Sequence, residues 1–413
     1  MNTKKLYYGS AYIKEFDAEV TSCVQDKKSW LVELNETAFY PEGGGQPADA
    51  GRLYIFADTA ARTDSACDKN SAANADAADF VAPAGASITV TDVHEKDGRI
   101  LHYCDKPLEP GTKVRGVIDW ERRFDHMQQH SGEHIVSGMI CSRFNCDNVG
   151  FHMGKGIVTI DYNADITFEE LKVLEEKANR YIWENHEFVE LWPDEEELKA
   201  LDYRSKKELT GEVRITSFPG ADMCACCGTH VRASGEVGLV KFISCQKFTK
   251  GTRIELLCGK RALDFLSMNF EQNAVIAKSM AASLDKTAAV HSKQKEELIA
   301  LKIRCAELET LHFEAVAREY ENKGDVLIFK PGLSPDSVRK LCVLLAASCK
   351  GRAAVFSSSE KDFKYAVCKE GADIREFIKE MNSALGGRGG GKDGFAQGSV
   401  SASEKEIREF FDK

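Results

Sequence analysis

The sequence predicts an α+β protein made of four parts in chain order. Residues 1–110 contain mostly strand-like segments such as 30–34 and 87–91, and residues 111–258 mix helical and strand patterns. Residues 260–323 contain neither Gly nor Pro and are mostly good helix formers, which predicts a helical linker over 259–323. Residues 324–413 alternate between strand and helix patterns, which predicts a small α/β domain.

The strand-rich first part has two interruptions. Residues 37–51, with the sequence TAFYPEGGGQPADAG, form a glycine-rich run between strand-like segments. Residues 58–87 are rich in Ala, Asp, Ser and Asn and poor in large apolar side chains. Because such a composition cannot bury a core, we expect a mobile surface insertion at about 58–87.

The second part is predicted to hold two helices flanked by strands. A helix is expected from Glu121 to about Ser142, and its apolar side carries Phe124, Met127, Ile135, Met139 and Ile140. A second helix is expected over 167–186, where Thr167 and Glu170 have the spacing of a capping box. Strands are expected at 156–161 and 238–243.

The linker is predicted to be one long helix or a helical pair. An imperfect apolar seam with 3–4 spacing runs along it: Leu298, Leu301, Cys305, Leu308, His312 and Ala315. A coiled-coil homodimer and a helical hairpin packed on itself both fit this seam.

In the last part, strands are expected at 325–329 and 353–357 and a helix at 336–348. A glycine-rich loop is expected at 386–394, followed by a final helix with a capping box between Ser403 and Glu406. We find no internal repeat.

Composition excludes several classes of protein. No apolar run approaches the ~20 residues that span a bilayer, and Lys4 and Lys5 are not followed by the apolar core of a signal peptide, so we expect a cytoplasmic protein without a membrane partner. The net charge of −10 argues against a sequence-blind nucleic-acid coat protein. Residues 323–413 hold 16 basic and 13 acidic residues, or +3, so any phosphate-binding bias lies in the last part.

Histidine and cysteine spacing points to a metal site. His126, His130 and His134 are four residues apart, so neighbouring imidazoles project from one face of the expected helix. Cys226 and His230 have the spacing Cys-x3-His, with Gly228 between them. Zinc accepts imidazole nitrogen and thiolate sulfur, usually in a tetrahedron. His126 and His130 have the same spacing as His130 and His134, and Cys224 and Cys227 compete with Cys226 as the thiolate ligand. A zinc with a purely structural role is a further alternative.

A zinc peptidase is a rival interpretation. Residues 130–134 also match the inverted peptidase pattern H-x-x-E-H, in which Glu133 would be the general base. Such a peptidase takes a downstream carboxylate as its third ligand, for which Glu169, Glu175 and Glu176 are the candidates. It has no need of a Cys-x3-His pair.

Four features together resemble one family. The run 37–51 is similar to the glycine-rich motif of alanyl-tRNA synthetase editing domains and of the free-standing AlaX editing proteins. His130-x3-His134 resembles their helix-borne histidine pair, residues 226–230 resemble their C-G-G-T-H signature, and the glycine-rich stretch 386–394 resembles the domain that ends alanyl-tRNA synthetases. The resemblance covers nearly the whole chain and is to the long form of AlaX.

The resemblance implies a fold and a ligand set. It implies a β-barrel-like domain at 1–110, an α+β editing domain at 111–258, a helical linker at 259–323 and a C-terminal domain at 324–413. It aligns His130, His134, Cys226 and His230 with the metal ligands, leaving out His126, Cys224 and Cys227, with one Zn²⁺ per chain. Cys227 stands where the family usually has Gly, and Glu133 falls on a variable position of the motif.

The implied activity is hydrolysis of mischarged tRNA(Ala), mainly Ser-tRNA(Ala) and also Gly-tRNA(Ala), without ATP. A synthetase needs a further catalytic domain before this point, so we expect action in trans on charged tRNA and no aminoacylation. A non-catalytic tRNA-binding or oligomerisation protein is the remaining alternative.

Candidate site residues follow from this activity. Thr37 is the candidate for contact with the serine hydroxyl, and Gln46 and Glu133 are placed with it as catalytic candidates. Gly43, Gly44 and Gly45 would allow close approach of the terminal adenosine, with Asp49 and His152 as further pocket residues. Arg388 and Lys392 are expected to contact RNA phosphate, and a core position is the competing interpretation of His152.

Overall fold

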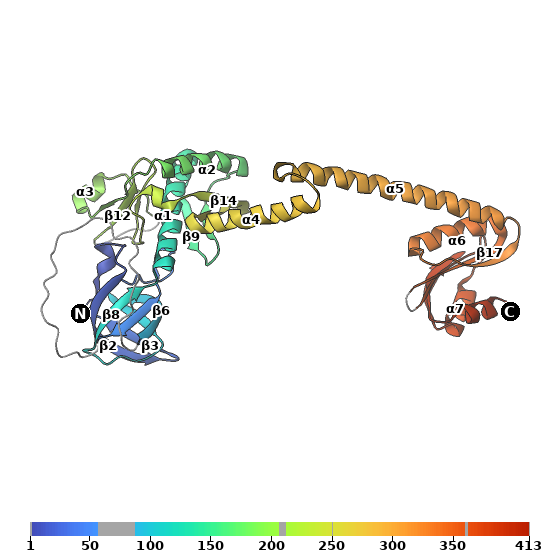
Figure 1. Ribbon diagram of the computed structural model, residues 1–413, viewed down its shortest axis with the longest axis horizontal. Helices are drawn as coiled ribbons and strands as arrows, with labels where there is room; N and C mark the ends of the chain where they lie inside the picture. Colours follow the sequence, from blue (N-terminus) through green and yellow to red (C-terminus); the bar gives the residue numbers. More distant parts are fainter. Residues whose placement is uncertain (1, 57–86, 206–211, 250, 360–361, 413) are drawn as a thin grey trace. The chain divides into compact units, whose positions relative to one another are not determined.

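The computed structural model describes residues 2–56, 87–205, 212–249, 251–359 and 362–412 (Figure 1). The expected insertion at 58–87 lies outside these residues, apart from Ser87, which begins a strand. The chain forms two compact units, Met1–Gln272 and Asn273–Lys413, and its fold is mixed α+β. Within the described residues, no helix is long and apolar enough to cross a membrane.

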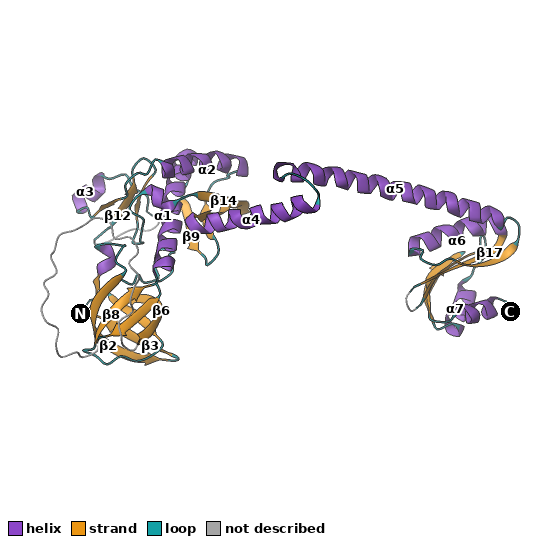
Figure 2. Cartoon of the chain, in the orientation of Figure 1, coloured by secondary structure: helices purple, strands orange, loops and turns teal. Residues whose placement is uncertain are grey.

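A closed six-stranded barrel forms the first part of the first unit (Figure 2). Its antiparallel strands, in barrel order, are β2 (Glu15–Asp26), β3 (Ser29–Leu34), β7 (Arg99–Cys104), β6 (Ser87–Lys96), β5 (Gly51–Ile55) and β8 (Lys113–Ile118). Alternate residues such as Val32, Leu34 and Val90 point inward and form the barrel core. The barrel that the family resemblance implied is confirmed.

The remainder of the first unit packs around a central helix, α1 (Trp120–Phe144), which follows the last barrel strand directly. Its core lies between α1, the helix α2 (Phe168–Trp183) and a sheet with the order β14-β15-β10-β9. These strands are β14 (Val240–Phe248), β15 (Gly251–Cys258), β10 (Val158–Tyr162) and β9 (Asn148–Met153).

Smaller elements complete this unit. A three-stranded sheet has the order β11 (Val189–Leu191), β12 (Ile215–Phe218) and β13 (Asp222–Ala225), and β1 (Lys4–Lys5) pairs in parallel with β4 (Glu36–Thr37). The short helices are η1 (Leu6–Tyr8), α3 (Glu195–Ala200) and η2 (Ser234–Val237), and α4 (Gly259–Ser279) follows β15.

Local sequence signals set the helix ends. Asp119 caps α1 by accepting a hydrogen bond from the backbone N–H of Arg122. The predicted capping box between Thr167 and Glu170 is present at the start of α2. Both predicted helices are therefore confirmed, with ends within three residues of the expected ones.

The second unit is a five-stranded sheet covered on both faces. The sheet order is β16 (Gly324–Phe329), β17 (Lys350–Ser358), β18 (Phe363–Cys368), β20 (Phe395–Val400) and β19 (Gly387–Lys392). Helices α5 (Thr287–Glu319) and α6 (Pro335–Cys349) pack on one face, and α7 (Arg375–Ala384) and α8 (Glu404–Phe411) on the other. The capping box of Ser403 and Glu406 is confirmed.

The helical stretch is two helices, because residues 280–286, which include the short helix η3 (Leu284–Lys286), separate α4 from α5. Leu298, Leu301 and Leu308 of the predicted seam are 52%, 62% and 49% exposed in this structure. The homodimer stays a prediction.

The glycine-rich stretch differs from the loop that the sequence predicted. Residues 387–392 form the edge strand β19, paired with β20. A side chain on Gly389 or Gly391 would overlap backbone atoms of β20, so the glycines allow an unusually close strand pair. Glycine-rich composition therefore indicates close backbone approach here and not a loop.

A fully buried ion pair joins the glycine-rich run 37–51 to α1. The guanidinium of Arg123 contacts both carboxylate oxygens of Asp49 and donates to the carbonyl oxygens of Ala11, at 2.8 Å, and Ala38, at 2.6 Å. Asp49 also accepts a hydrogen bond from the backbone N–H of Tyr40. Both charged side chains are 0% exposed, so each depends on the other for compensation.

We predict that Arg123→Met lowers the free energy of unfolding by about 3–5 kcal/mol, because it leaves the Asp49 carboxylate buried without its partner. Urea denaturation followed by circular dichroism measures this loss. Arg115→Met, which breaks the exposed pair with Asp17, is the control and should change stability by about 1 kcal/mol or less. An equal loss of stability in the two variants would contradict a special role of the buried pair of Arg123 and Asp49.

Candidate metal centre

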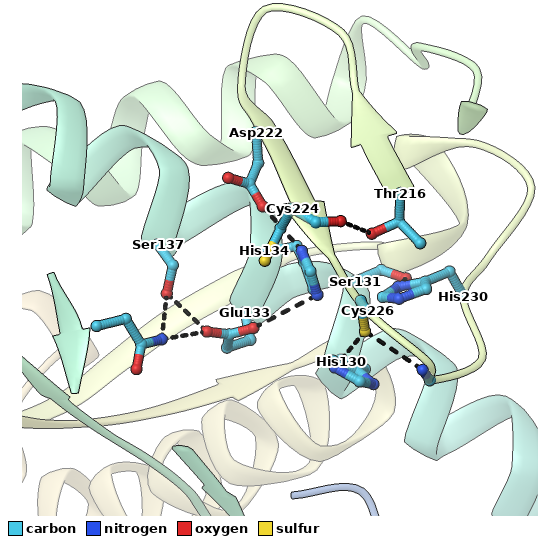
Figure 3. A network of polar contacts seen from close by, with 12 residues as sticks. His130, Ser131, Glu133, His134, Ser137, Thr216, Asp222, Cys224, Cys226 and His230 are labelled. Carbon is cyan, nitrogen blue, oxygen red and sulfur yellow. Dashed lines mark hydrogen bonds and ion pairs between the residues drawn. The ribbon is translucent and has the colours of Figure 1, made fainter. Parts of the chain in front are cut away.

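Two distant segments supply one group of possible metal ligands. His130 and His134 lie one turn apart on α1, while Cys226 and His230 lie in the loop after β13 (Figure 3). One ligand atom from each residue lies within 4.8 Å of the other three. The three imidazoles are buried and the thiol is partly buried, so the structure brings the four predicted ligands together.

The rings crowd around the sulfur. Cys226 Sγ lies 3.5 Å from His130 Nε2, and the ring centroids of His130 and His230 are 4.6 Å apart. The ring of His134 lies 5.2 Å from that of His130 and 4.8 Å from that of His230. Three imidazole nitrogens and one sulfur thus face one small volume.

Glycine at position 228 allows this approach. A Cβ atom at Gly228 would overlap the ring of His130, so any larger residue would push the loop away from α1. A Cβ atom at Gly138 would likewise overlap the carbonyl oxygen of Ala221, just before β13. The sequence therefore permits helix and loop to pack at backbone distance at two points.

Each imidazole is held through its Nδ1 atom. His130 Nδ1 lies 2.8 Å from Gln46 Oε1, an amide oxygen that can only accept, so Nδ1 carries the proton. His134 Nδ1 donates in the same way to Asp222 Oδ2 at 2.8 Å. In the neutral imidazoles these bonds leave the Nε2 lone pairs for a cation, while without a cation His134 Nε2 carries a proton toward Cys226.

His230 completes the arrangement. Its Nδ1 lies 3.2 Å from Ser131 Oγ, which also accepts from the backbone N–H of Val231. Its Nε2 is buried and has no hydrogen-bond partner among the residues that the structure describes. A buried nitrogen without a partner is rare in proteins, and a bound cation would satisfy it.

The electrostatics favour a thiolate at Cys226. Although burial disfavours the charge, His130 and His134 lower the pKa of Cys226 well below its usual range. Burial likewise opposes a charge on His134, but Cys226 and Asp222 together raise the pKa of His134. The pKa of His230 is lowered, mainly by burial, so this imidazole is neutral. A cation bound to the thiolate would take the place of the proton on His134.

The four donors fit zinc, which usually binds four thiolate or imidazole ligands in a tetrahedron. The carboxylate of Asp222 is itself fixed, because Arg204 donates two hydrogen bonds to it at 2.7 and 2.9 Å. Burial raises the pKa of Asp222, but His134 and Arg204 outweigh it and the pKa is lowered. Such outer hydrogen bonds hold ligands in place and raise metal affinity.

The competing residues lie elsewhere. Cys224 groups with His134 and Asp222, whose polar atoms already bond to each other. Cys227 is exposed, and His126 is not among the metal-ligand groups of the described residues. Burial lowers the pKa of His126 to about 3, which keeps it neutral.

Thr37 lies at the barrel and is fully buried. Its Oγ1 is 2.9 Å from His102 Nε2 and accepts a hydrogen bond from the backbone N–H of Phe39 at 3.1 Å. His102 Nδ1 donates to the carbonyl oxygen of Val32, so Nε2 accepts the Thr37 proton. Burial lowers the pKa of His102 to about 4, which keeps this neutral form. One lone pair of the Thr37 hydroxyl therefore remains for an incoming donor.

The glycine turn lies beside the cluster. Gly43 and Gln46 exchange two backbone hydrogen bonds, and Gly44 and Gly45 have positive φ angles of 60° and 84°. A side chain on Gly45 would overlap Phe151, whose ring stacks on His130 with centroids 5.3 Å apart. This turn thus contacts the first ligand histidine through Gln46 directly and through Phe151.

Two predicted pocket residues have other surroundings. Asp49 is occupied by Arg123 and Tyr40, so its contact with substrate stays a prediction. His152 is exposed on β9, so the competing interpretation as a core histidine is wrong. Strand alternation turns its neighbour Phe151 toward α1 instead. A role of His152 as a pocket wall stays a prediction.

Glu133 is buried beside the cluster but faces a different network. Its Oε1 accepts hydrogen bonds from Ser137 Oγ at 2.7 Å and Asn148 Nδ2 at 2.6 Å, while Oε2 lies 3.9 Å from His134 Nε2. The carboxylates that a peptidase would need, Glu175 and Glu176, bond to Lys241 and Arg180. None of Glu169, Glu175 and Glu176 is in a metal-ligand group of the described residues, which disfavours the inverted peptidase.

Arg388 and Lys392 lie on β19 in the second unit and are exposed. Arg388 borders a groove of about 390 Å³ between α7 and β19, together with Arg375, Lys379, Asn382 and the glycines 387 and 389–391. The groove therefore combines three cationic side chains with accessible backbone.

Sequence reasoning missed the residues that hold the ligands. Asp222, Ser131, Thr229 and Arg204 were not singled out, and Gln46 was predicted as a catalytic candidate and not as the residue that orients His130. Thr229 N–H donates to Gln46 Oε1 at 3.1 Å, and Gln46 Nε2 donates to Thr229 Oγ1 at 2.8 Å. Thr229 stands beside the ligand His230, which was the only available signal.

We predict that Gln46→Leu weakens zinc binding about 10- to 100-fold, because it removes the acceptor that orients His130. Competition with a chromogenic chelator measures the affinity of the purified variant. The exposed Gln25 on β2 gives the control, Gln25→Leu, with affinity expected to be unchanged. If both variants hold zinc as tightly as the parent chain, Gln46 does not support the site.

Comparisons with known proteins agree with this geometry. Residues 213–255, which include Cys226 and His230, match the "Threonyl and Alanyl tRNA synthetase second additional domain", and residues 322–413 match the DHHA1 domain. The alanyl-tRNA editing protein AlaX-L of Pyrococcus horikoshii is 29% identical over 98% of this chain and 96% of its own length.

Longer proteins match as well. The alanine–tRNA ligases of Pyrococcus abyssi and Archaeoglobus fulgidus are 28% and 29% identical over 98% and 96% of this chain, which spans 42% of each ligase. The C-Ala domain structure of Aquifex aeolicus alanyl-tRNA synthetase is 22% identical and covers 22% of this chain and 90% of its own, with a TM-score of 0.20. The chain is thus a relative of the long-form AlaX-type editing proteins and of the corresponding regions of alanine–tRNA ligases, which confirms the resemblance found in its motifs.

Proposed function

We propose that this chain edits alanyl-tRNA by hydrolysing, in trans, the ester of mischarged tRNA(Ala), mainly Ser-tRNA(Ala) and also Gly-tRNA(Ala). The observation that carries the proposal is the buried group of three imidazoles and one thiol beside the glycine turn. Its relative AlaX-L of Pyrococcus horikoshii is named an alanyl-tRNA editing protein, which supports the proposal. The proposed enzyme needs no ATP, does not aminoacylate, and works in the cytoplasm.

His130, His134, Cys226 and His230 are proposed to hold one Zn²⁺. When bound, zinc supplies a Lewis acid that positions the aminoacyl group or lowers the pKa of a water molecule. Gln46, Asp222 and Ser131 keep the three imidazoles oriented so that no rearrangement is needed before binding. Such preorganisation is a main source of catalytic power in buried sites.

The glycine turn is proposed to receive the terminal adenosine. Gly44 has no atom within 4 Å of where its side chain would be, so the terminal nucleotide can approach this turn closely. Glu133 sits behind His134, where its carboxylate balances the charge of that imidazole. We assign it no essential step, because Ser137 and Asn148 occupy one of its oxygens.

Serine selectivity is proposed to come from Thr37. Its hydrogen is donated to His102, so toward substrate the hydroxyl can only accept. A serine hydroxyl can donate to it, whereas the alanine methyl cannot. Leaving such a buried polar group unpaired costs about 1–3 kcal/mol, which disfavours correctly charged Ala-tRNA.

The second unit is proposed to bind RNA. Arg388 and Lys392 on β19 offer cations to phosphate, and Gly389, Gly390 and Gly391 between them line the adjoining groove. The domain limits of 1–110, 111–258, 259–323 and 324–413, and a homodimer through the linker or the last domain, remain part of the proposal.

Cys226→Ala is predicted to lose zinc and deacylase activity together, because it removes the thiolate of the cluster. The assay follows release of serine, glycine and alanine from the corresponding charged tRNA(Ala), with and without a zinc chelator, beside metal analysis. Cys305→Ala is the control, since this cysteine is exposed on α5.

Three outcomes would count against the proposal. Full zinc retention by Cys226→Ala would contradict the ligand set. Deacylation that continues in the presence of the chelator would indicate that the zinc is structural and not catalytic. Peptidase activity on unfolded protein without any deacylation would replace the function.

Thr37→Val is predicted to lower the ratio of the rates on Ser-tRNA(Ala) and Ala-tRNA(Ala) by about 5- to 100-fold, matching the loss of one buried hydrogen bond. Single-turnover deacylation of both substrates gives the ratio. Thr37→Ser keeps the hydroxyl and should retain most of the selectivity. An unchanged ratio in Thr37→Val would remove Thr37 from substrate recognition.

A further inference from the structure

An exposed aromatic pair borders the loop that carries Cys226. Trp192, directly after β11, packs edge-on against Tyr8 of η1, with ring centroids 5.5 Å apart. Tyr8 is partly buried, while 46% of the Trp192 surface is exposed. The pair presents a wide aromatic surface from two segments far apart in the sequence.

Hydrogen bonds connect this surface to the metal loop. Trp192 Nε1 donates to Glu190 Oε1 at 2.9 Å, and Glu190 Oε2 accepts from Arg214 at 2.6 Å. Arg214 in turn donates to the carbonyl oxygens of Cys226 at 3.0 Å and Gly228 at 2.7 Å. The position of Trp192 is thereby fixed relative to the thiol ligand.

Tyr8 is tied to the same loop. The guanidinium of Arg214, which donates to the Cys226 carbonyl oxygen, lies 5.5 Å from the centre of the Tyr8 ring. The amine of Lys5 lies 5.7 Å from the same ring and pairs with Glu95 at 2.8 Å, as Arg214 pairs with Glu190 at 2.6 Å. Two cations, each with an acidic partner, thus lie beside the aromatic surface. Aromatic faces next to cations are the usual surface on which single-stranded nucleic acids stack their bases.

An exposed tryptophan held by polar bonds has no role in the core. Trp192 has its indole N–H satisfied by Glu190 and much of its ring uncovered in the described chain. Tryptophan placed in this way is typical of binding surfaces, where the uncovered ring is buried by a ligand.

We infer that Trp192 and Tyr8 form a stacking subsite for the terminal adenine base of a single-stranded RNA 3′ end. The inference rests on the proposed function, which requires that end to reach the loop of Cys226. In this arrangement the ribose ester lies at the glycine turn and the imidazole cluster, and its base stacks on Trp192. The subsite makes no contact with the reacting carbonyl, so it acts on binding and not on the chemical step.

The test uses the full chain and a labelled single-stranded RNA ending in CCA, with fluorescence anisotropy as the readout. A second RNA of the same length lacks only its terminal base. Trp192→Ala should weaken binding of the complete RNA about 5- to 100-fold, the range found for one stacked base, and bind both RNAs equally. Trp192→Phe keeps an aromatic face and should recover most of the affinity.

Trp183 gives the matched control. It is 72% exposed at the end of α2, so Trp183→Ala removes the same side chain from another exposed position and should leave binding unchanged. In deacylation assays, Trp192→Ala should raise KM with kcat and zinc content unchanged. Wild-type affinity in Trp192→Ala, equal losses in both tryptophan variants, or no preference of the parent chain for the complete RNA would overturn the subsite.

The two proposals fail separately. RNA binding that depends on Trp192 in a chain without deacylase activity would keep the subsite and refute the hydrolase. Deacylation with no effect of Trp192→Ala on KM would keep the hydrolase and refute the subsite. If a partner protein, and not the RNA, shields Trp192 from solvent, the stacking subsite is also overturned.

Discussion

The hydrogen bond between Gln46 and His130 joins three parts of the first unit at one point. The Gln46 amide oxygen accepts from the imidazole on α1 and from the backbone of Thr229, next to the ligand His230. The amide nitrogen then donates back to the Thr229 hydroxyl. Because the side chain is fully buried, none of these bonds can be exchanged for water without opening the structure. The glycine turn, the helix α1 and the loop after β13 are therefore fixed relative to one another, and none of them can shift without breaking these bonds.

The cluster is costly to bury without a cation, and its surroundings reduce that cost. A thiolate at Cys226, stabilised by His130 and His134, stands next to a protonated His134 whose other nitrogen faces Asp222. Arg204 neutralises Asp222 in turn, so charges of alternating sign run outward from the sulfur. Buried charges are tolerated only in such compensated chains. Within the described part of the chain His230 Nε2 has no hydrogen-bond partner, and a bound metal would satisfy this atom.

The sequence predicted the features that depend on residues close together in the chain. The capping boxes at Thr167 and Ser403 and the shared face of His130 and His134 depend only on residues within one turn. The bond of His134 to Asp222 joins residues 88 positions apart, and no pattern in one sequence encodes it. Glycine-rich sequence is typical both of loops and of closely packed strand pairs, so residues 387–392 were predicted to be a loop. Only the position of the neighbouring strand β20 distinguishes the two possibilities. Phe151 could have been found, since alternation along β9 places it opposite His152.

Positions 227 and 228 show why one departure from the family signature is tolerated and another would not be. Cys227 stands where the resemblance implied glycine; it is exposed and belongs to none of the metal-ligand groups of the described residues. Gly228 has the ring of His130 where its own side chain would be, so no other residue fits without moving a ligand. A substitution at position 228 is therefore expected to disturb the candidate ligand geometry more than a substitution at the exposed position 227.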